Sequence, residues 1–186
     1  MELLSNTLVL ICCAPCCVAL VEQIARAGTD ATLFFYNPNI YPQTEYEKRK
    51  SEVLRIAKLY GVKVIDADYR PEEYDKAVKG LESCPERGER CSACFYLRLA
   101  ETARVARENG FANFTSTLGF SRHKNLAQVH AAGEKAAANY EIPYLAMDFR
   151  AGDAQLRAAE LAKEHNIYRQ TYCGCKFSLE YKKQKL

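Results

Sequence analysis

The sequence predicts an α/β fold in which a mainly parallel sheet carries helices on both faces. Two observations support this prediction. Short apolar runs that suit buried strands alternate along the chain with longer stretches of helical periodicity. The 186 residues also show no repeat, no low-complexity segment and no break in composition. Alternation of this kind is typical of strand–helix–strand units, so residues 1–186 are expected to form a single domain with a cysteine-containing C-terminal tail.

Five apolar runs are predicted as strands because each is short, apolar and bounded by residues that break regular structure. The first ends at a cysteine-rich turn, and the second is closed by Asn37-Pro38-Asn39. The predicted strands are residues 8–11, 31–36, 62–65, 113–118 and 144–148.

Six stretches are predicted as helices from apolar residues at helical spacing and from their end signals. Thr44 and Glu47 form a possible capping box, Pro71 can start a helix, and Gly28 and Gly61 can end one. The predicted helices are residues 18–27, 44–60, 71–79, 91–109, 125–139 and 153–165. The chain from residue 167 onward is expected to be irregular.

The cysteines are the unusual part of an otherwise ordinary composition. The net charge of +3 permits contact with a polyanion without requiring it, and a dedicated nucleic-acid domain is usually more basic. A secreted disulfide scaffold would be shorter, with its cysteines spread along loops. The nine cysteines instead cluster, at positions 12, 13, 16, 17, 84, 91, 94, 173 and 175. This pattern indicates metal or redox chemistry in a reducing compartment.

The apolar segment 7–21 does not fit a signal peptide or a membrane span. No Lys or Arg precedes it, and Pro15 interrupts it. It is also shorter than the roughly 20 residues that a transmembrane helix needs. The protein is therefore expected to be cytoplasmic, without a membrane partner.

The turn after the first predicted strand carries Cys12-Cys13-Ala14-Pro15-Cys16-Cys17. Thiolates are soft ligands that suit iron–sulfur clusters or zinc, and a turn between a strand and a helix can direct several of them to one point. Cys12, Cys13 and Cys16 are therefore interpreted as metal ligands or redox groups. Cys17 falls inside the helix and is interpreted as a small buried apolar residue.

Cys91-x-x-Cys94 opens a predicted helix. The spacing places both sulfurs on one face, near the positive end of the helix dipole, which favours thiolates. With Cys12 and Cys13 the pair supplies the four thiolates of a [4Fe–4S] cluster. Cys84 lies in the polar loop before this helix and is given no role.

Cys173-Gly174-Cys175 forms the third group. A C-x-C pair can close a small, strained disulfide ring, and a central Gly relieves the constraint on the backbone. Strained, exposed disulfides tend to be the catalytic ones. Metal ligation by the same two thiols is the alternative that the residues leave open.

Polar residues at the predicted strand ends are further candidates, because ligands of parallel sheets bind at the carboxyl ends of the strands. Cys12, Asn37, Thr117 and Asp148 all fall there. Asp148 either belongs to the site or pairs with Arg150. Other side chains that could line the site or touch phosphates are Tyr36, Asn37, Asn39, His123, Arg169 and the lysines at positions 182, 183 and 185.

These motifs, in this order, resemble those of the QueH family of epoxyqueuosine reductases. Two positions depart from the family pattern, since Leu10 stands where a His is expected and Arg122 where a Pro is expected. The blocks that carry the resemblance are Cys12-Cys13-Ala14-Pro15-Cys16, Phe35-Tyr36-Asn37-Pro38-Asn39-Ile40 with Glu45-Tyr46 and Arg49, Cys91-x-x-Cys94 with Arg98-Leu99, Phe114-Thr115-Ser116-Thr117-Leu118, Asp148-Phe149-Arg150 and Tyr168-Arg169-Gln170-Thr171-Tyr172-Cys173-Gly174-Cys175.

The resemblance implies a Rossmann-like domain of the HUP type and an oxidoreductase that converts epoxyqueuosine to queuosine at the wobble position of tRNA, the last step of queuosine biosynthesis. It implies a [4Fe–4S] cluster, and carried onto this chain its ligands are Cys12, Cys13, Cys91 and Cys94. It also implies a second metal ion, iron, with Cys16 or Asp148 as candidate ligand, and a redox-active pair, Cys173 and Cys175. The expected partner is tRNA carrying epoxyqueuosine in its anticodon; the sequence does not indicate the electron donor.

Two other classes of protein compete with this interpretation. A zinc protein that binds nucleic acid usually has two separated C-x-x-C pairs, a pattern that the adjacent Cys12 and Cys13 fit poorly. A metal-free thiol–disulfide oxidoreductase needs only one reactive pair, and nine cysteines exceed that need. Colour and iron content separate these classes from an iron–sulfur enzyme.

Overall fold

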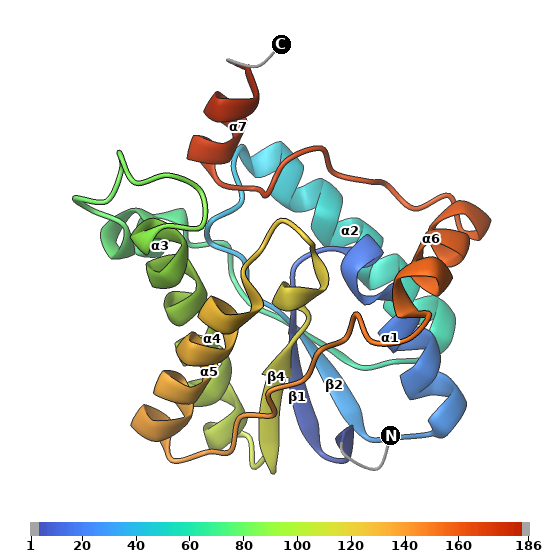
Figure 1. The fold of residues 1–186 in the computed structure, drawn as a ribbon. Helices are drawn as coiled ribbons and strands as arrows, with labels where there is room; N and C mark the ends of the chain where they lie inside the picture. The colour runs from blue at the N-terminus through green and yellow to red at the C-terminus, as the bar shows by residue number, and fades with distance from the viewer. Residues whose placement is uncertain (1–3, 184–186) are drawn as a thin grey trace.

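A computed structural model describes residues 4–183, whose centre is a four-stranded sheet with all strands parallel (Figure 1). The strands are β1 (Thr7–Ile11), β2 (Ala31–Phe35), β3 (Val64–Asp66) and β4 (Asn113–Ser116). Their order across the sheet is β3-β2-β1-β4. The predicted α/β class with a parallel sheet is confirmed.

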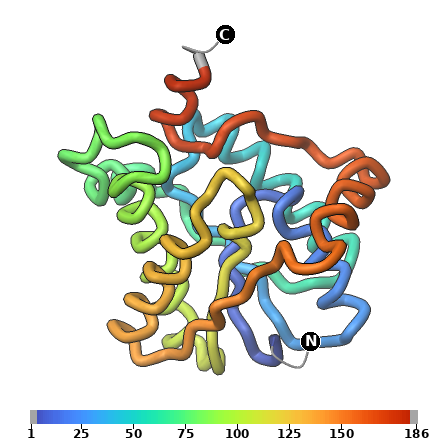
Figure 2. The backbone as a smooth tube through the Cα atoms, viewed as in Figure 1, coloured from blue at the N-terminus to red at the C-terminus, as the bar shows by residue number. Residues whose placement is uncertain are grey.

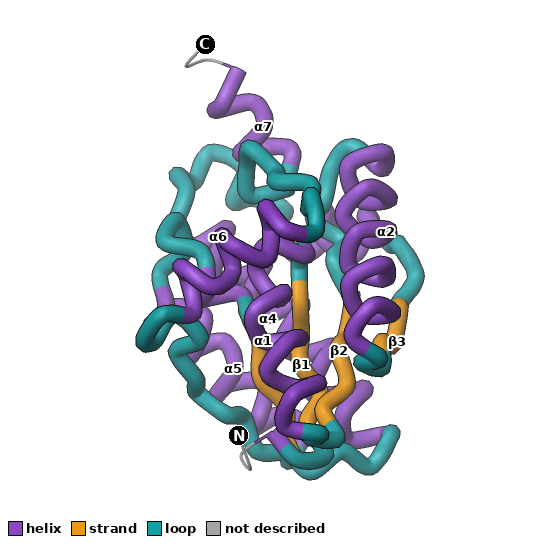
Figure 3. Tube along the Cα trace, turned by 90° about the vertical axis from the view of Figure 1, so that its right-hand side faces the viewer, coloured by secondary structure: helices purple, strands orange, loops and turns teal. Residues whose placement is uncertain are grey.

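Helices cover both faces of this sheet (Figures 1 and 3). One face carries α1 (Ala14–Ala27), α2 (Gln43–Tyr60) and α6 (Ala154–Glu164), and the other carries α4 (Glu89–Glu108) and α5 (Leu126–Tyr140), with α3 (Pro71–Ala77) beside α4. After α6 the chain crosses the top of the molecule to α7 (Lys176–Lys183), as the backbone tube in Figure 2 shows. No helix within residues 4–183 is both long enough and apolar enough to span a bilayer.

Strand β1 explains why a continuous apolar run marks the middle of the sheet. Val9 and Ile11 pack in the apolar cluster on the α1 side, and Leu8 and Leu10 pack in the cluster on the α4 side. A parallel strand covered on both faces has no solvent-facing positions, so the residues that point to either side of the sheet are all apolar. Leu10 is fully buried there, at the position where the family pattern led us to expect a His.

The strand order determines where a ligand site can form. From β1 the chain moves outward to β2 and β3, and the next strand, β4, lies on the opposite side of β1. In open α/β sheets, ligands bind at the carboxyl ends of the strands where the order reverses. Here that point lies between the end of β1, followed by Cys12, and the end of β4, followed by Thr117, whose amide donates to the Leu10 carbonyl at 2.9 Å.

The predicted strand at residues 144–148 is wrong. Tyr144 makes only an isolated parallel bridge to Phe114. The ladder stops because the Leu145 carbonyl is occupied by the Thr115 hydroxyl, at 2.7 Å, and the Met147 amide turns back to the same carbonyl, at 3.0 Å. Because the Leu145 carbonyl is occupied by these two donors, this segment does not extend the sheet.

Several helix boundaries differ from the prediction by one or two residues, and α1 and the tail differ more. Helix α1 begins at Ala14, four residues earlier than the predicted residue 18, with Pro15 in its first turn, where the missing N–H is no loss. Cys16 and Cys17 therefore lie on the helix itself. The tail, predicted to be irregular, contains helix α7. Near its start, Ser178 donates its amide to the Cys175 sulfur, at 3.4 Å, and its hydroxyl to the Cys175 carbonyl, at 3.2 Å.

Candidate functional site

A pocket of about 420 Å³ brings together cysteines from segments that are far apart in the sequence. It opens between the β1–α1 turn, the start of α4, the loop after β4 and the C-terminal segment. The cysteines that line it are Cys12, Cys16, Cys91, Cys173 and Cys175. All three cysteine groups of the sequence thus contribute to one cavity at the carboxyl edge of the sheet.

The three sulfurs of the β1–α1 turn form the tightest group. The Sγ atoms of Cys12, Cys13 and Cys16 all lie within 4.8 Å of one another, and those of Cys12 and Cys13 are 3.6 Å apart. Metal–thiolate bonds are about 2.3 Å long, so sulfurs this close can reach the same metal centre. Of the side chains in residues 4–183, these three are the group whose spacing suits a metal ion.

Cys91 and Cys94 lie near the start of α4, as predicted. The Arg87 amide donates to the Cys91 sulfur at 3.2 Å. Cys94 is buried against Tyr74 and Val78, and this burial raises the pKa of its thiol to about 12. The two sulfurs are not part of the close group on the β1–α1 turn. Cys91 lines the pocket, whereas Cys94 is buried next to it on α4 and is not among the lining residues.

Two cations beside Cys12 have no carboxylate partner among the described residues. Arg98 is 2% exposed and donates to two neutral acceptors, the Tyr36 carbonyl at 3.4 Å and the Asn37 side chain. The Lys124 ammonium lies 4.0 Å from the Cys12 sulfur. A buried charge is normally compensated, so an anionic group belongs here. Hydrogen bonds with Cys13 and Cys16, aided by these two cations, hold the pKa of Cys12 well below its usual range.

The C-terminal segment closes the pocket from above the sheet edge. Gln170 donates to the Cys13 sulfur at 2.9 Å, which joins this segment directly to the β1–α1 turn. Cys173 is exposed toward the pocket, whereas Cys175 is half-buried in the apolar cluster of Tyr74 and Cys94. Both thiols are free, as are those of the other cysteines.

Some of the predicted polar residues line the pocket and others do not. His123 lines it, and so does Lys182, which donates to the Thr171 hydroxyl at 2.6 Å. Asp148 is not among the lining residues; it faces solvent and binds Arg150 at 2.9 and 3.2 Å, and this partner lowers its pKa. Arg169 is not among the lining residues either. The side chain of the lysine at 183 and all of residue 185 fall outside the described part.

Tyr36 and Asn37 stand behind the pocket rather than in its lining. The Tyr36 hydroxyl donates to Glu73. The Asn37 amide donates to the Ile11 carbonyl at 3.1 Å and its oxygen accepts from Arg98, so it fixes the ends of β1 and β2 to α4. Asn39 is buried and likewise absent from the lining. These residues support the wall of the pocket.

Sequence reasoning gave no role to Arg98, Lys124 or Gln170. A signal for Arg98 was present, because it follows Cys94 by four residues and therefore lies on the same face of α4. Arg122, the second departure from the family pattern, points away from the pocket and donates to Gln155 of α6 at 2.8 Å.

Comparisons with known proteins agree on one family. The family model described as "Epoxyqueuosine reductase QueH" matches residues 7–181. The chain is 44% identical over 169 residues to "Epoxyqueuosine reductase QueH" of Histophilus somni, covering 90% of this chain and 70% of the relative. It is 37% identical over 185 residues to the protein of the same name from Thermotoga maritima, covering 98% of this chain and 94% of the relative.

A solved structure shares the fold at low sequence identity. The "U34-tRNA thiolase NcsA from Methanococcus maripaludis with its [4Fe-4S] cluster" superposes with a TM-score of 0.56 and 12% identity, covering 97% of this chain and 65% of that chain. A likeness at this level of identity supports only the arrangement of the sheet and its helices, which agrees with a Rossmann-like fold. It carries no argument about the side chains of the pocket.

Proposed function

This chain belongs to the QueH family of epoxyqueuosine reductases and is therefore an oxidoreductase, and we propose that it reduces epoxyqueuosine to queuosine at the wobble position of tRNA. The observation that carries the proposal is the pocket lined by cysteines from all three groups of the sequence. Such a concentration of thiols suits a metal cofactor and electron transfer.

The proposed cofactor is a [4Fe–4S] cluster held by Cys12, Cys13, Cys91 and Cys94, with a second iron beside it. Cys12 and Cys91 support this ligand set because both line one pocket, while Cys13, with its sulfur 3.6 Å from that of Cys12, and Cys94, one turn after Cys91, are buried outside the lining. Arg98 and Lys124 supply positive charge that thiolate-bound iron would balance. Cys16 is the better candidate for the second iron, since it lines the pocket and lies within 4.8 Å of Cys12 and Cys13. Asp148 would have to leave Arg150 to serve there.

The reaction removes the epoxide oxygen as water and leaves a carbon–carbon double bond, which requires two electrons and two protons. When bound, the cluster would supply single electrons and the second iron would polarise a C–O bond. The proposed role of Cys173 and Cys175 is to pass from dithiol to disulfide, which releases two electrons and two protons. An external reductant must then restore the dithiol.

The pocket has the size and surroundings that a single modified nucleoside requires. Its volume of about 420 Å³ falls within the roughly 300–1,000 Å³ of small-molecule sites. Single-stranded RNA is usually read by extruding a base into such a cavity. His123 and Lys182 at the lining are the proposed contacts to the neighbouring phosphates.

The first test is anaerobic purification, which keeps the thiols and any bound iron reduced, as in the cytoplasm, where we expect the enzyme to act. Iron and sulfide counts near four per chain or above, with a broad visible absorption, would support the cluster. The loaded protein should convert epoxyqueuosine-containing tRNA, followed by mass spectrometry of the released nucleosides. Stoichiometric zinc in a colourless protein would point to the zinc class, and a metal-free active protein to simple thiol–disulfide exchange.

A further inference from the structure

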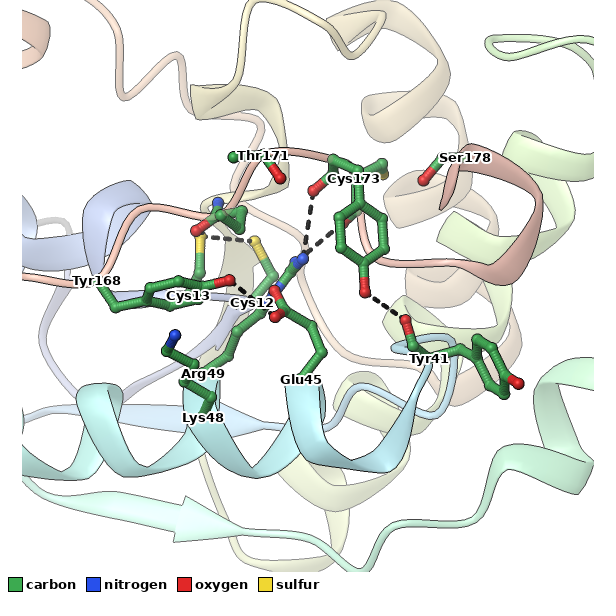
Figure 4. A network of polar contacts seen from close by, with 12 residues as sticks. Cys12, Cys13, Tyr41, Glu45, Lys48, Arg49, Tyr168, Thr171, Cys173 and Ser178 are labelled. Carbon is green, nitrogen blue, oxygen red and sulfur yellow. Dashed lines mark hydrogen bonds and ion pairs between the residues drawn. The ribbon is translucent and has the colours of Figure 1, made fainter. Parts of the chain in front are cut away.

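Helix α2 contacts the C-terminal segment next to Cys173 through the guanidinium of Arg49. The Arg49 side chain is 1% exposed. It donates to the Cys173 carbonyl at 3.0 Å and to the Tyr172 carbonyl at 3.2 Å (Figure 4). A planar guanidinium presents its donors in a fixed fork, so one side chain fixes two consecutive peptide groups of this segment.

Glu45 sets the orientation of Arg49. Its carboxylate pairs with the Arg49 Nε at 2.8 Å, one helical turn away, and accepts the Tyr168 hydroxyl at 2.8 Å. The Lys48 ammonium lies 3.7 Å from the centre of the Tyr168 ring. Figure 4 shows Glu45, Lys48 and Arg49 rising from α2 toward the segment that carries Tyr168 and Cys173. Neither charge of the Arg49–Glu45 pair is left uncompensated.

Gly174 is adapted to this arrangement on the other side of the loop. Its carbonyl accepts the Tyr41 amide at 2.8 Å, and its φ of 129° lies where residues with a side chain are rarely found. A Cβ at this position would lie 3.0 Å from the Arg49 Nη1. The loop backbone therefore fits closely against Arg49, with three consecutive carbonyls, from 172 to 174, each bound to a donor.

We propose that Arg49, oriented by Glu45, is a positioning residue that fixes the Cys173-Gly174-Cys175 loop so that its two thiols keep separate surroundings. Both thiols line the pocket, but Cys173 is exposed there, whereas Cys175 is half-buried near Tyr74 and accepts the Ser178 amide. The role deepens the proposed function, since it gives the redox pair a defined starting geometry. It does not require Arg49 to touch the substrate.

The position of the contacts on the chain supports this role. Other polar side chains of α2 hold the same segment farther upstream: Arg55 donates to the His165 carbonyl at 3.0 Å, and Glu52 accepts the Tyr168 amide at 3.1 Å. Only Arg49, among the described side chains of α2, reaches the carbonyl of a loop cysteine. Its loss leaves two carbonyls without their charged donor, and the loop is then free to turn.

The test measures the two thiols separately in the full-length protein. The tryptic peptide 170–176 contains Cys173 and Cys175 and no other cysteine, so a brief anaerobic pulse of iodoacetamide can be read at each thiol by fragmentation. The variants are Arg49→Gln and Arg49→Lys. Arg55→Gln is the matched control, because it removes the same charge from the same helix. Circular dichroism and the melting temperature check the fold.

In the wild-type protein Cys173 should react faster than Cys175. In Arg49→Gln this preference should fall by about tenfold, as expected when a hydrogen bond from a charged donor is lost. Arg49→Lys should recover part of it, and Arg55→Gln should leave it unchanged. A folded Arg49→Gln protein with the wild-type preference would overturn the proposal. If Arg49→Gln does not fold, Glu45→Gln, which keeps the guanidinium, should show a smaller loss of preference, and an unchanged preference would overturn it equally.

Failure of the proposed function gives a different result. If the labelling preference changes but the wild-type protein does not reduce epoxyqueuosine in tRNA, the positioning role holds and the proposed function fails. If the wild-type protein is active and Arg49→Gln keeps its kcat, the positioning role fails alone. With both correct, Arg49→Gln lowers kcat while KM for tRNA stays close to wild type.

Discussion

The β1–α1 turn and the Cys173-Gly174-Cys175 loop both bring cysteines to the pocket, but different interactions hold them in place. The turn is continuous with a buried strand and a helix, so backbone hydrogen bonds and apolar packing place Cys12, Cys13 and Cys16. The loop lies outside regular structure and depends on side chains, chiefly Arg49. The proposed metal ligands of the turn are thus held by the sheet and its helix, whereas the proposed redox pair is held by side-chain contacts.

This difference separates two kinds of damage. A change on the turn should remove the metal and the activity together. A change on the loop or on α2 should remove activity and leave the metal in place. The following substitutions test that separation, beginning with the largest expected effect.

Serine substitutions of the cysteines should separate the regions most clearly. Cys12→Ser should lose iron, visible absorption and turnover, because a hydroxyl is a poor replacement for a soft thiolate ligand. Cys173→Ser should keep iron and absorption while kcat falls by more than roughly 1,000-fold, as when a reacting group is removed. Cys84→Ser is the control and should retain both properties. Turnover in both Cys173→Ser and Cys175→Ser would eliminate the proposed redox pair.

Gly174→Ala should damage the loop without affecting the turn. The added Cβ is forced into a disfavoured backbone region, at a cost of about 1–3 kcal/mol, and meets Arg49. We expect kcat to fall about tenfold or more while iron content stays at the wild-type level. Gly152→Ala is the control for a positive φ in open space: its φ of +60° lies in the milder left-handed region, and nothing lies within 4 Å of the new Cβ. Equal losses of activity in the two variants would show that contact with Arg49 is unimportant.

Lys124→Gln, in the loop after β4, should change the charge beside the β1–α1 turn and leave the metal bound. Its ammonium lies 4.0 Å from the Cys12 sulfur, so removing the charge disfavours the more negative, reduced state of a bound cluster. A shift on the order of 50 mV to lower potential is expected, since 59 mV corresponds to tenfold for one electron. Potentiometric titration measures it, with Lys124→Arg restoring the potential and the remote Lys63→Gln as control. An unchanged potential in Lys124→Gln would place the ammonium too far from the cluster to matter.

Glu22→Gln should leave both regions unchanged and alter only stability. Glu22 joins α1 to α6 through Arg157, at 2.6 and 2.9 Å, and this partner lowers the pKa of the carboxyl. A lowered pKa in the folded state stabilises the protein above the unfolded pKa of about 4.3, and the gain disappears as the pH falls through the folded value. The melting temperature should drop by about 2–4 °C at pH 7, with the difference shrinking toward pH 3. A constant difference across this range would mean that packing, rather than charge, is lost.

The sequence by itself determined the parallel sheet, its helices and the three cysteine groups. Apolar runs such as Leu8–Ile11 can be recognised as strands because a strand covered on both faces has to be apolar throughout. C-x-x-C at the start of a helix can be recognised because it is a local pattern. The strand wrongly predicted at residues 144–148 shows the limit of prediction from local sequence. The Thr115 hydroxyl, from another strand, occupies the Leu145 carbonyl that a longer ladder would need. Local composition does not contain that competition.

Only the tertiary structure decided how the cysteine groups meet and what surrounds them. The strand order places Cys12 beside the loop that carries Lys124, more than a hundred residues later in the chain. Arg49 and Cys173 are likewise 124 positions apart and meet through a hydrogen bond. Isolated arginines and lysines are usually solvated surface residues, so nothing in their spacing marks these as buried. Arg49 is buried and Lys124 half-buried because distant segments pack around them, and that packing brings both charges to the site.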